Sequence, residues 1–165
     1  MTEHLPDLEF HASEPGAALA PLSFQVTVDC DDPHAQARFW AAALGYLRED
    51  GHDFVEAIVA AGWASKEDTV LVDGRLAFAT GGGIIHPDDL DAPRGRKRRV
   101  LFMRVEGRPR VKNSWHLDLN VGREHIEAEV ARLTSLGATR QYDVDEPGAF
   151  HTTMADPEGN LFCVQ

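Results

Sequence analysis

The stretch Phe24-Gln25-Val26-Thr27-Val28-Asp29 alternates apolar and polar side chains, and Trp115-His116-Leu117-Asp118-Leu119-Asn120 alternates in the same phase. Each stretch leads into a segment with helical spacing, and the two segments end at Leu44-Gly45 and Leu136-Gly137. Superposing the two halves brings Gln25 onto His116 and Thr27 onto Asp118. An internal repeat decides the fold, because one supersecondary unit must then occur twice. It also indicates that function lies on the face that Gln25 and His116 share.

The repeat unit is predicted to be one strand, one helix and three further strands. In the first half, Asp32 suits an N-cap, Pro33 suits the first helical position and Gly45 suits the position after the helix. In the second half, residues 126–133 have the apolar spacing of a helix that packs on a sheet. The expected strands, including two short runs around an Asp-Gly turn, lie at residues 22–29, 46–48, 69–72, 76–79, 100–105, 114–121, 138–142, 150–154 and 161–165.

The first half also carries an insertion. Residues 54–63 have the pattern of an amphipathic helix, and residues 81–97 are rich in Gly, Pro, Asp and Arg, which indicates a long loop. The complete pattern predicts an α+β fold of two tandem βαβββ modules, which form a curved mixed sheet with a concave cup and carry their helices on the outer face. We expect a flexible tail at residues 1–20 and a single domain at residues 21–165. Within this domain, module one spans about residues 21–111 and module two about residues 112–165.

Composition limits the classes of function. The net charge of −11, from 16 basic and 27 acidic residues, argues against a nucleic-acid partner, since phosphate binding needs a cationic surface. No apolar stretch has the length of a membrane span and no secretory signal precedes residue 21, so we expect no membrane partner and a cytoplasmic location. Cys30 and Cys163 are interpreted as reduced thiols, with a disulfide between them as the alternative. The basic run at residues 94–99 is either a solvated loop or a contact for an anion or a partner.

Alternation along the strands separates a packed face from an open face. The residues predicted to pack beneath the helices are Phe24, Val26, Val28, Leu117, Leu119 and Val121. The residues predicted to line the open face are Gln25, Thr27, Met103, His116, Asp118, His151, Thr153 and Cys163. If the open faces of the two modules curve towards each other, Gln25 and His116 converge with the last-strand residues in a cup that holds a small ligand.

Four segments of the sequence resemble the vicinal oxygen chelate superfamily, which includes glyoxalase I, bleomycin-resistance proteins and extradiol dioxygenases. They lie at residues 29–46, 112–119, 129–138 and 154–164. The last of them, with its Asp156-Pro157-Glu158-Gly159-Asn160 turn, is the most specific. The sequence is most similar to the glyoxalase-like domain branch, and the resemblance spans residues 22–165.

This resemblance implies a metal site in which the first strand of each module supplies His or Gln and the last strand supplies Glu. Gln25 and His116 occupy the first-strand positions, but Met103 and Cys163 stand where the carboxylates are expected. Without anionic oxygen ligands a hard divalent ion lacks charge compensation, and a thioether is a poor ligand for it. No cofactor is therefore firmly predicted, although His116 and Gln25 are the candidate ligands if a divalent metal binds. Glyoxalase I activity itself is not expected.

The candidate residues keep alternative roles. His116 is a metal ligand, a general base, or a histidine satisfied by a neighbour such as Gln25. Asp118 either orients His116 or bonds to the backbone. Cys163 is a nucleophile only if a cation lowers its pKa, and otherwise it is a small apolar filler.

Three functions fit these features. The first is a glyoxalase-like protein with a degenerate metal site, which binds a small organic ligand and catalyses lyase- or isomerase-type proton transfer, with His116 as acid/base and Gln25 as positioning donor. The second is a non-catalytic protein that resembles bleomycin-resistance proteins and binds an antibiotic or another small molecule. The third is a regulatory domain that contacts a partner through residues 81–97. A homodimer is expected, because domains of the resembled family often dimerise.

Overall fold

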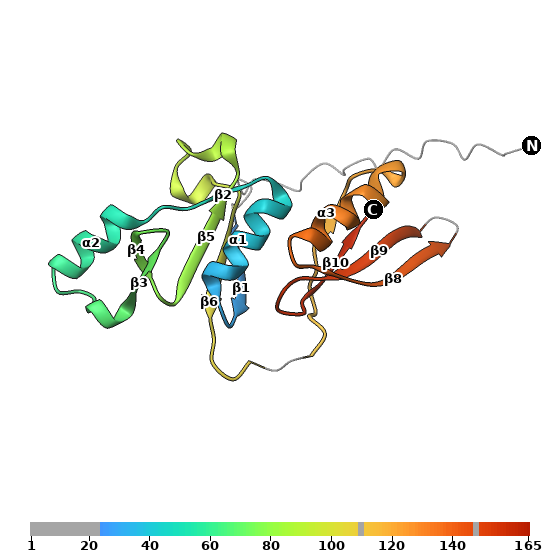
Figure 1. Cartoon of the computed structure of the whole chain (residues 1–165). Coiled ribbons are helices and arrows are strands. Elements are labelled where there is room, and N and C mark those ends of the chain that lie inside the picture. Colours follow the sequence, from blue (N-terminus) through green and yellow to red (C-terminus); the bar gives the residue numbers. More distant parts are fainter. Residues whose placement is uncertain (1–23, 109–110, 147–148) are drawn as a thin grey trace, which may run out of the picture.

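The computed structural model describes residues 24–108, 111–146 and 149–165, so the expected tail at residues 1–20 lies outside the described residues. The described chain forms two four-stranded mixed sheets and one two-stranded sheet (Figure 1). Both four-stranded sheets are open and carry the same order of elements. This arrangement confirms the α+β fold with two tandem βαβββ modules.

The two modules share one topology. Module one comprises β1 (Val26–Cys30), α1 (Pro33–Leu44), β2 (Leu47–Arg48), β5 (Gly81–Ile85) and β6 (Arg99–Arg104), with the sheet order β1-β6-β5-β2. Module two comprises β7 (Asp118–Leu119), α3 (Ile126–Ser135), β8 (Thr139–Glu146), β9 (Ala149–Ala155) and β10 (Leu161–Val164), with the sheet order β7-β10-β9-β8. In both, the first strand pairs in parallel with the last, and the other pairs are antiparallel.

The capping residues predicted for the two ends of α1 are confirmed. The Asp32 carboxylate accepts hydrogen bonds from the backbone N–H groups of His34 and Ala35, each at 3.0 Å. Gly45 then ends the helix with a φ of 67°, in the left-handed region that favours glycine. The apolar face predicted for residues 126–133 is also confirmed, because its three apolar side chains on α3 are buried.

The prediction of a loop at residues 81–97 was wrong for its first part, because residues 81–85 form the strand β5. Glycine is rare inside strands, which is why the pattern indicated a loop. Gly82 has a packing reason: a Cβ at this position would lie 2.8 Å from the carbonyl oxygen of Pro33, at the start of α1. The helix therefore packs directly on the backbone of β5. Residues 86–98 contain only short 3-10 helices, at Pro87–Asp89 and Arg94–Arg96.

The insertion lies between β2 and β5 and is placed beside module one, away from module two (Figure 1). It contains α2 (His52–Ala60), a short 3-10 helix (Lys66–Asp68) and the hairpin of β3 (Thr69–Val72) and β4 (Arg75–Phe78). Its helix packs on the hairpin, with the rings of Phe54 and Phe78 centred 6.4 Å apart. The insertion is thus a small helix–hairpin unit attached to module one.

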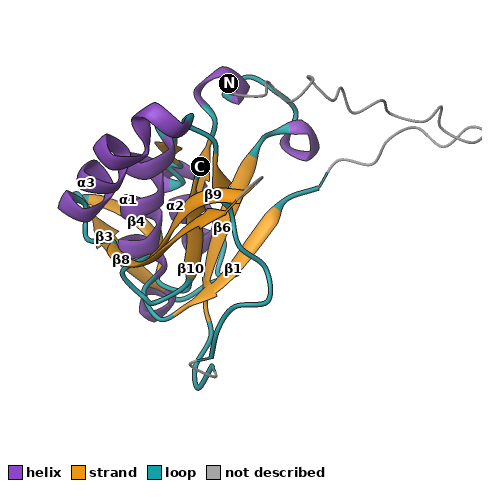
Figure 2. Cartoon of the chain, turned by 90° about the vertical axis from the view of Figure 1, so that its right-hand side faces the viewer, coloured by secondary structure: helices purple, strands orange, loops and turns teal. Residues whose placement is uncertain are grey.

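One apolar core extends through both modules. Helices α1 and α3 lie on the same side of the strands (Figure 2). The ring of Trp40 on α1 lies 5.1 Å from the ring of Phe162 on β10. Arg132 of α3 donates to the backbone carbonyls of Ala42 and Ala43 at the end of α1, at 3.0 and 2.7 Å. The outer position predicted for the helices is therefore confirmed.

Two predicted packing residues of the first strand do not reach this core. Val28 packs against it, but Phe24 is 84% exposed and Val26 is 37% exposed. In the second half Leu117 is likewise 37% exposed, and the strand is shorter than the predicted residues 114–121. The helices cover only the later part of each first strand, so alternation alone overestimated the packed face.

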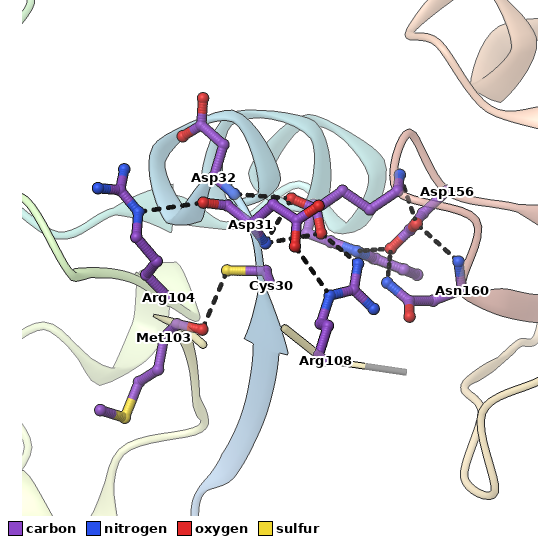
Figure 3. A network of polar contacts seen from close by, with 10 residues as sticks. Cys30, Asp31, Asp32, Met103, Arg104, Arg108, Asp156 and Asn160 are labelled. Carbon is purple, nitrogen blue, oxygen red and sulfur yellow. Dashed lines mark hydrogen bonds and ion pairs between the residues drawn. The ribbon is translucent and has the colours of Figure 1, made fainter. Parts of the chain in front are cut away.

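A polar network joins the two modules at the end of β1 (Figure 3). Glu158 of module two accepts from the backbone N–H of Asp31, at 2.9 and 3.0 Å, and from that of Asp32, at 2.8 Å. Arg108 pairs with Glu158 and lies 3.3 Å from the Asp31 carboxylate. The turn predicted around Glu158 therefore also connects the modules.

Candidate functional site

The predicted site residues fall into two groups, one in each module. Gln25, Thr27 and Met103 belong to module one, where Gln25 donates to the Thr27 hydroxyl at 3.2 Å. The second group lies around β7 and β10 and is described below. Among the described residues, no hydrogen bond, ion pair or common pocket joins Gln25 to His116. Each group forms a half-site within its own module, and the convergence of the two groups in one cup stays a prediction.

The first half-site opens into a cleft of about 970 Å³ between the sheet of module one and the insertion. Its walls are largely apolar and come from β6, α2 and β4, with Leu101, Met103, Phe54, Val55, Leu76 and Phe78 among them. The Met103 side chain points away from the polar network at the end of β1 (Figure 3). The insertion thus forms one wall of a ligand-sized cleft.

An ion pair lies within the cleft beside Gln25. Arg99 contacts both carboxylate oxygens of Glu49, with Nε 2.7 Å from Oε1, and its Nη1 donates to Gln25 Oε1 at 2.6 Å. The Arg99 side chain is only 11% exposed. Gly83 leaves space for this pair, since a Cβ there would lie 2.1 Å from a Glu49 oxygen. The cleft therefore combines apolar walls with this hydrogen-bonded ion pair and with further charged side chains, namely Arg48, Asp50, Asp73, Arg75 and Lys97.

The sequence did not identify Glu49 or Arg99 as site residues. Arg99 ends the basic run at residues 94–99, which was interpreted as a solvated loop or a partner contact. In the structure Arg98 pairs with Asp89 at 2.8 Å, and Lys97 donates to the Leu90 carbonyl at 2.7 Å. The three cations at the end of this run are thus held by groups within module one. Their partners are distant in the sequence or lie in irregular segments, so periodicity could not reveal them.

The second half-site contains His116, Asp118, Cys163 and Thr153. His116 Nε2 lies 3.3 Å from Asp118 Oδ1, and both side chains are nearly half exposed. Cys163 is paired with Asp118 across the parallel strands and with Thr153 across the antiparallel ones. The Thr153 hydroxyl is 3.9 Å from Cys163 Sγ. One nitrogen, oxygen or sulfur atom from each of His116, Asp118 and Cys163 lies within 4.8 Å of the others.

The environment of Cys163 disfavours a nucleophile. Burial chiefly raises the pKa of the Cys163 thiol, and Asp118 adds to the rise while Thr153 opposes it. A thiol must ionise to attack, so a raised pKa leaves it protonated and unreactive near neutral pH. Cys30 is buried in module one, and both cysteines are free, as the sequence predicted.

His151 has no described polar contact at the half-site. It lies on β9 opposite Val144, two residues before Thr153 and therefore on the same face of the strand. Its side chain is partly buried. Its ligand-binding role stays a prediction.

A match to a protein family shows which family this chain belongs to. A model described as the glyoxalase-like domain matches residues 25–165, which is most of the chain. This chain belongs to the glyoxalase-like domain family. It is thereby a member of the vicinal oxygen chelate superfamily that the sequence resembles.

Solved structures resemble the glyoxalase-like domain in fold. A glyoxalase/bleomycin resistance protein/dioxygenase family enzyme from Burkholderia phytofirmans is 16% identical, with a TM-score of 0.54 over 85% of this chain and 94% of its own. The Mn(II)-bound fosfomycin resistance protein FosX from Listeria monocytogenes is 10% identical, with a TM-score of 0.53 over 90% of each chain. A glyoxalase-related enzyme from Fulvimarina pelagi is 16% identical, with a TM-score of 0.50 over 88% and 87%. No curated protein matches the sequence significantly.

In the described part of the chain, no helix has the length and apolar character that crossing a bilayer requires.

The divalent site that the family resemblance implies does not fit these residues. Gln25 Oε1, the ligand atom expected from the first strand, is bound by the Arg99 guanidinium, whose positive charge would repel a metal ion. Met103 offers only a thioether where a carboxylate is expected. A site shared between Gln25 and His116 is therefore not supported by the donor set.

Proposed function

We propose that this glyoxalase-like domain binds a small organic molecule in the cleft of module one. The observation that carries the proposal is the cleft itself, about 970 Å³ between the sheet and the insertion. Its volume is at the upper end of the range for small-molecule sites, which combine apolar walls with a few well-placed polar groups. Gln25, Glu49 and Arg99 supply such polar groups here.

The cleft suits a ligand that combines an apolar body with polar or charged groups. The apolar wall residues favour burial of hydrocarbon or aromatic surface, while the side chains of Gln25, Glu49 and Arg99 offer hydrogen bonds to a polar group. Two of the structurally similar proteins are fosfomycin resistance proteins, and the superfamily includes bleomycin-resistance proteins. Antibiotics are therefore the first class of ligand to screen.

Proton transfer of the lyase or isomerase type is the second candidate function. The observation in its favour is the His116–Asp118 pair, in which a carboxylate lies 3.3 Å from an imidazole nitrogen and can orient it. His116 does not, however, line the cleft. Binding without His116-dependent chemistry is therefore the better-supported function.

We also propose that two copies associate as a homodimer. Several large apolar side chains near the start of the first strand of each module are exposed, among them Phe24, at 84%, and Trp115, at 90%. Exposed apolar side chains at matching positions suit a two-fold interface, in which each surface meets its own copy. The free thiols of Cys30 and Cys163 agree with the cytoplasm as the proposed location.

A ligand screen tests the binding proposal. Antibiotics and small organic acids, amines and amides are added to the purified protein, and a rise in melting temperature identifies binders. The affinity of a hit is then measured by calorimetry for Met103→Ala, for His116→Ala and for Tyr142→Ala, an exposed aromatic on β8 of module two. We expect about a tenfold or greater loss for Met103→Ala only, given the apolar contact that it removes. A hit whose affinity depends on His116 instead would favour the second candidate function.

A further inference from the structure

The cleft of module one differs in charge from the chain as a whole. Its lining carries four Arg or Lys side chains and three Asp or Glu side chains, whereas the chain carries 16 and 27. The charged side chains of the lining are Arg48, Arg75, Lys97 and Arg99, with Glu49, Asp50 and Asp73. A cleft in which cations predominate, in a protein in which acids predominate, favours a ligand of negative charge.

Three of the four basic side chains are already paired with carboxylates. The pairs are Arg48 with Asp73, Arg75 with Asp50 and Asp53, and Arg99 with Glu49. The ammonium of Lys97 instead donates to the backbone carbonyl of Leu90 at 2.7 Å, and no carboxylate among the described residues pairs with it. Lys97 is therefore the basic side chain of the described lining whose charge no ion pair balances.

Lys97 and Arg99 reach the cleft from one short segment. Lys97 has an extended backbone, with φ −79° and ψ 135°, and Arg99 is the first residue of β6. Alternate side chains of an extended segment point to opposite sides, which agrees with the pairing of Arg98 with Asp89, neither of which lines the cleft. The start of β6 thus presents two cations to the same cleft.

The hydrogen-bonding groups that remain at the start of β6 are donors. An ammonium has three N–H groups and a guanidinium has five. The described contacts of Lys97 use one of them, and those of Arg99 with Glu49 and Gln25 use three. Both carboxylate oxygens of Glu49 and the amide oxygen of Gln25 already accept from Arg99. A ligand group that accepts hydrogen bonds and carries a negative charge therefore complements this part of the wall.

We propose that the ligand of this cleft is an organic acid, whose carboxylate binds Lys97 and the remaining N–H groups of Arg99. The inference rests on the proposed function, because it names the ligand class of the same cleft. The Arg99 side chain is only 11% exposed and Lys97 is partly buried, so limited contact with water strengthens the charge-assisted hydrogen bonds. The apolar body of the acid then lies against the apolar wall, which includes Met103 and Phe78. In this arrangement Lys97 determines which charge the cleft accepts.

Three probes that share one apolar body and differ in charge test the proposal. They are 2-naphthoate, 2-naphthamide and 2-naphthylmethylamine, which are an anion, a neutral molecule and a cation near neutral pH. Calorimetry with the full-length protein measures their dissociation constants. We expect naphthoate to bind about 10–100-fold more tightly than the amide, because hydrogen bonds to charged groups contribute about this much, and the amine to bind more weakly still. Added salt should weaken the binding of naphthoate and leave that of the amide unchanged.

The variants Lys97→Met and Lys97→Arg assign the preference to one side chain. Lys97→Met removes the charge and keeps an unbranched side chain, so the preference for naphthoate over the amide should fall about tenfold. Lys97→Arg keeps the charge and should retain the preference. Lys112→Met is the matched control, since the ammonium of Lys112 also donates to a backbone carbonyl, that of Asn113 at 3.4 Å, but Lys112 does not line the cleft. Circular dichroism verifies that the variants are folded.

The outcomes separate this inference from the proposed function. Equal affinities of the three probes, or an equal loss of preference in Lys97→Met and Lys112→Met, overturn the organic acid as the ligand. If Met103→Ala then still weakens the binding of every probe, the cleft stays the binding site and the proposed function survives. Failure of all three probes to bind overturns both.

Discussion

Glu158 satisfies donors from both the backbone and a side chain with a single carboxylate. It accepts from the N–H groups that precede α1 and pairs with Arg108, and its side chain is only 12% exposed. A carboxylate near the start of a helix is also favoured by the helix dipole. This residue therefore stabilises the contact between the modules more than a surface ion pair would.

Glu158→Gln should lower the free energy of unfolding by about 1–3 kcal/mol, because it removes a charge-assisted pairing and leaves Arg108 without its carboxylate partner from module two. Urea denaturation followed by tryptophan fluorescence measures the change. Glu124→Gln is the control, since that side chain is 75% exposed and should change stability little. Equal stability of the two variants would contradict the role assigned to Glu158.

Because the Cys30 thiol is buried, we expect the free energy of unfolding to depend on pH. Burial raises the pKa of its thiol from 9.0 to about 12, with Glu158 adding to the effect. The folded state therefore holds the proton more tightly than the unfolded state, so the contribution is fully present below pH 9 and is lost as the pH rises towards 12. Unfolding measurements between pH 8 and 11 should show a smaller loss for Cys30→Ala than for the wild type. Parallel losses of stability in the two proteins would contradict the assignment.

Strand β5 shows why one element escaped prediction. Its three glycines gave no alternating pattern, yet Gly82 lies beneath the start of α1 and Gly83 beneath the Glu49–Arg99 pair. Alternation and capping residues are visible in a sequence, which is why α1, α3 and the last strand were predicted. A sequence does not show that a glycine is needed to let another element approach.

The two glycines should respond differently to substitution. Gly82→Ala places a Cβ against the backbone of Pro33, which cannot move without α1, and should cost about 1–3 kcal/mol in the free energy of unfolding. Gly83→Ala meets only the ends of two long side chains and should cost less, but it should displace the Glu49–Arg99 pair and weaken ligand binding in the cleft. Urea denaturation and calorimetry of both variants compare the two effects. A larger loss of stability for Gly83→Ala would contradict this interpretation.

At the scale of the whole molecule, the internal repeat predicted the architecture but not the arrangement of the site. The repeat correctly placed Gln25 and His116 in equivalent positions, just before the first strand of each module, and four sequence segments identified the family. It could not show that Arg99 binds Gln25, or that Asp118 and Cys163 become neighbours, because those contacts depend on the register between strands. The described contacts show a cleft in module one and a cluster of His116, Asp118 and Cys163 in module two, and the convergence of the two half-sites in one cup stays a prediction.

The homodimer is tested by multi-angle light scattering at micromolar concentration. We expect the mass of two chains for the wild type, and the mass of one for the double variant Phe24→Asp and Trp115→Asp, because charges would then replace exposed apolar side chains on the proposed interface. Circular dichroism verifies that the variant is folded. A wild-type mass of one chain contradicts the proposal.

The position of the insertion has a consequence for how this protein can evolve. The segment leaves from β2 and returns to β5, and these two strands are hydrogen-bonded neighbours, with Leu47 opposite Ile85. Because its ends are anchored by adjacent strands, residues 49–80 can lengthen, shorten or be exchanged at little entropic cost to the sheet. The wall that this insertion gives to the cleft can thus change by replacement of one segment, while the strands of both modules stay unchanged.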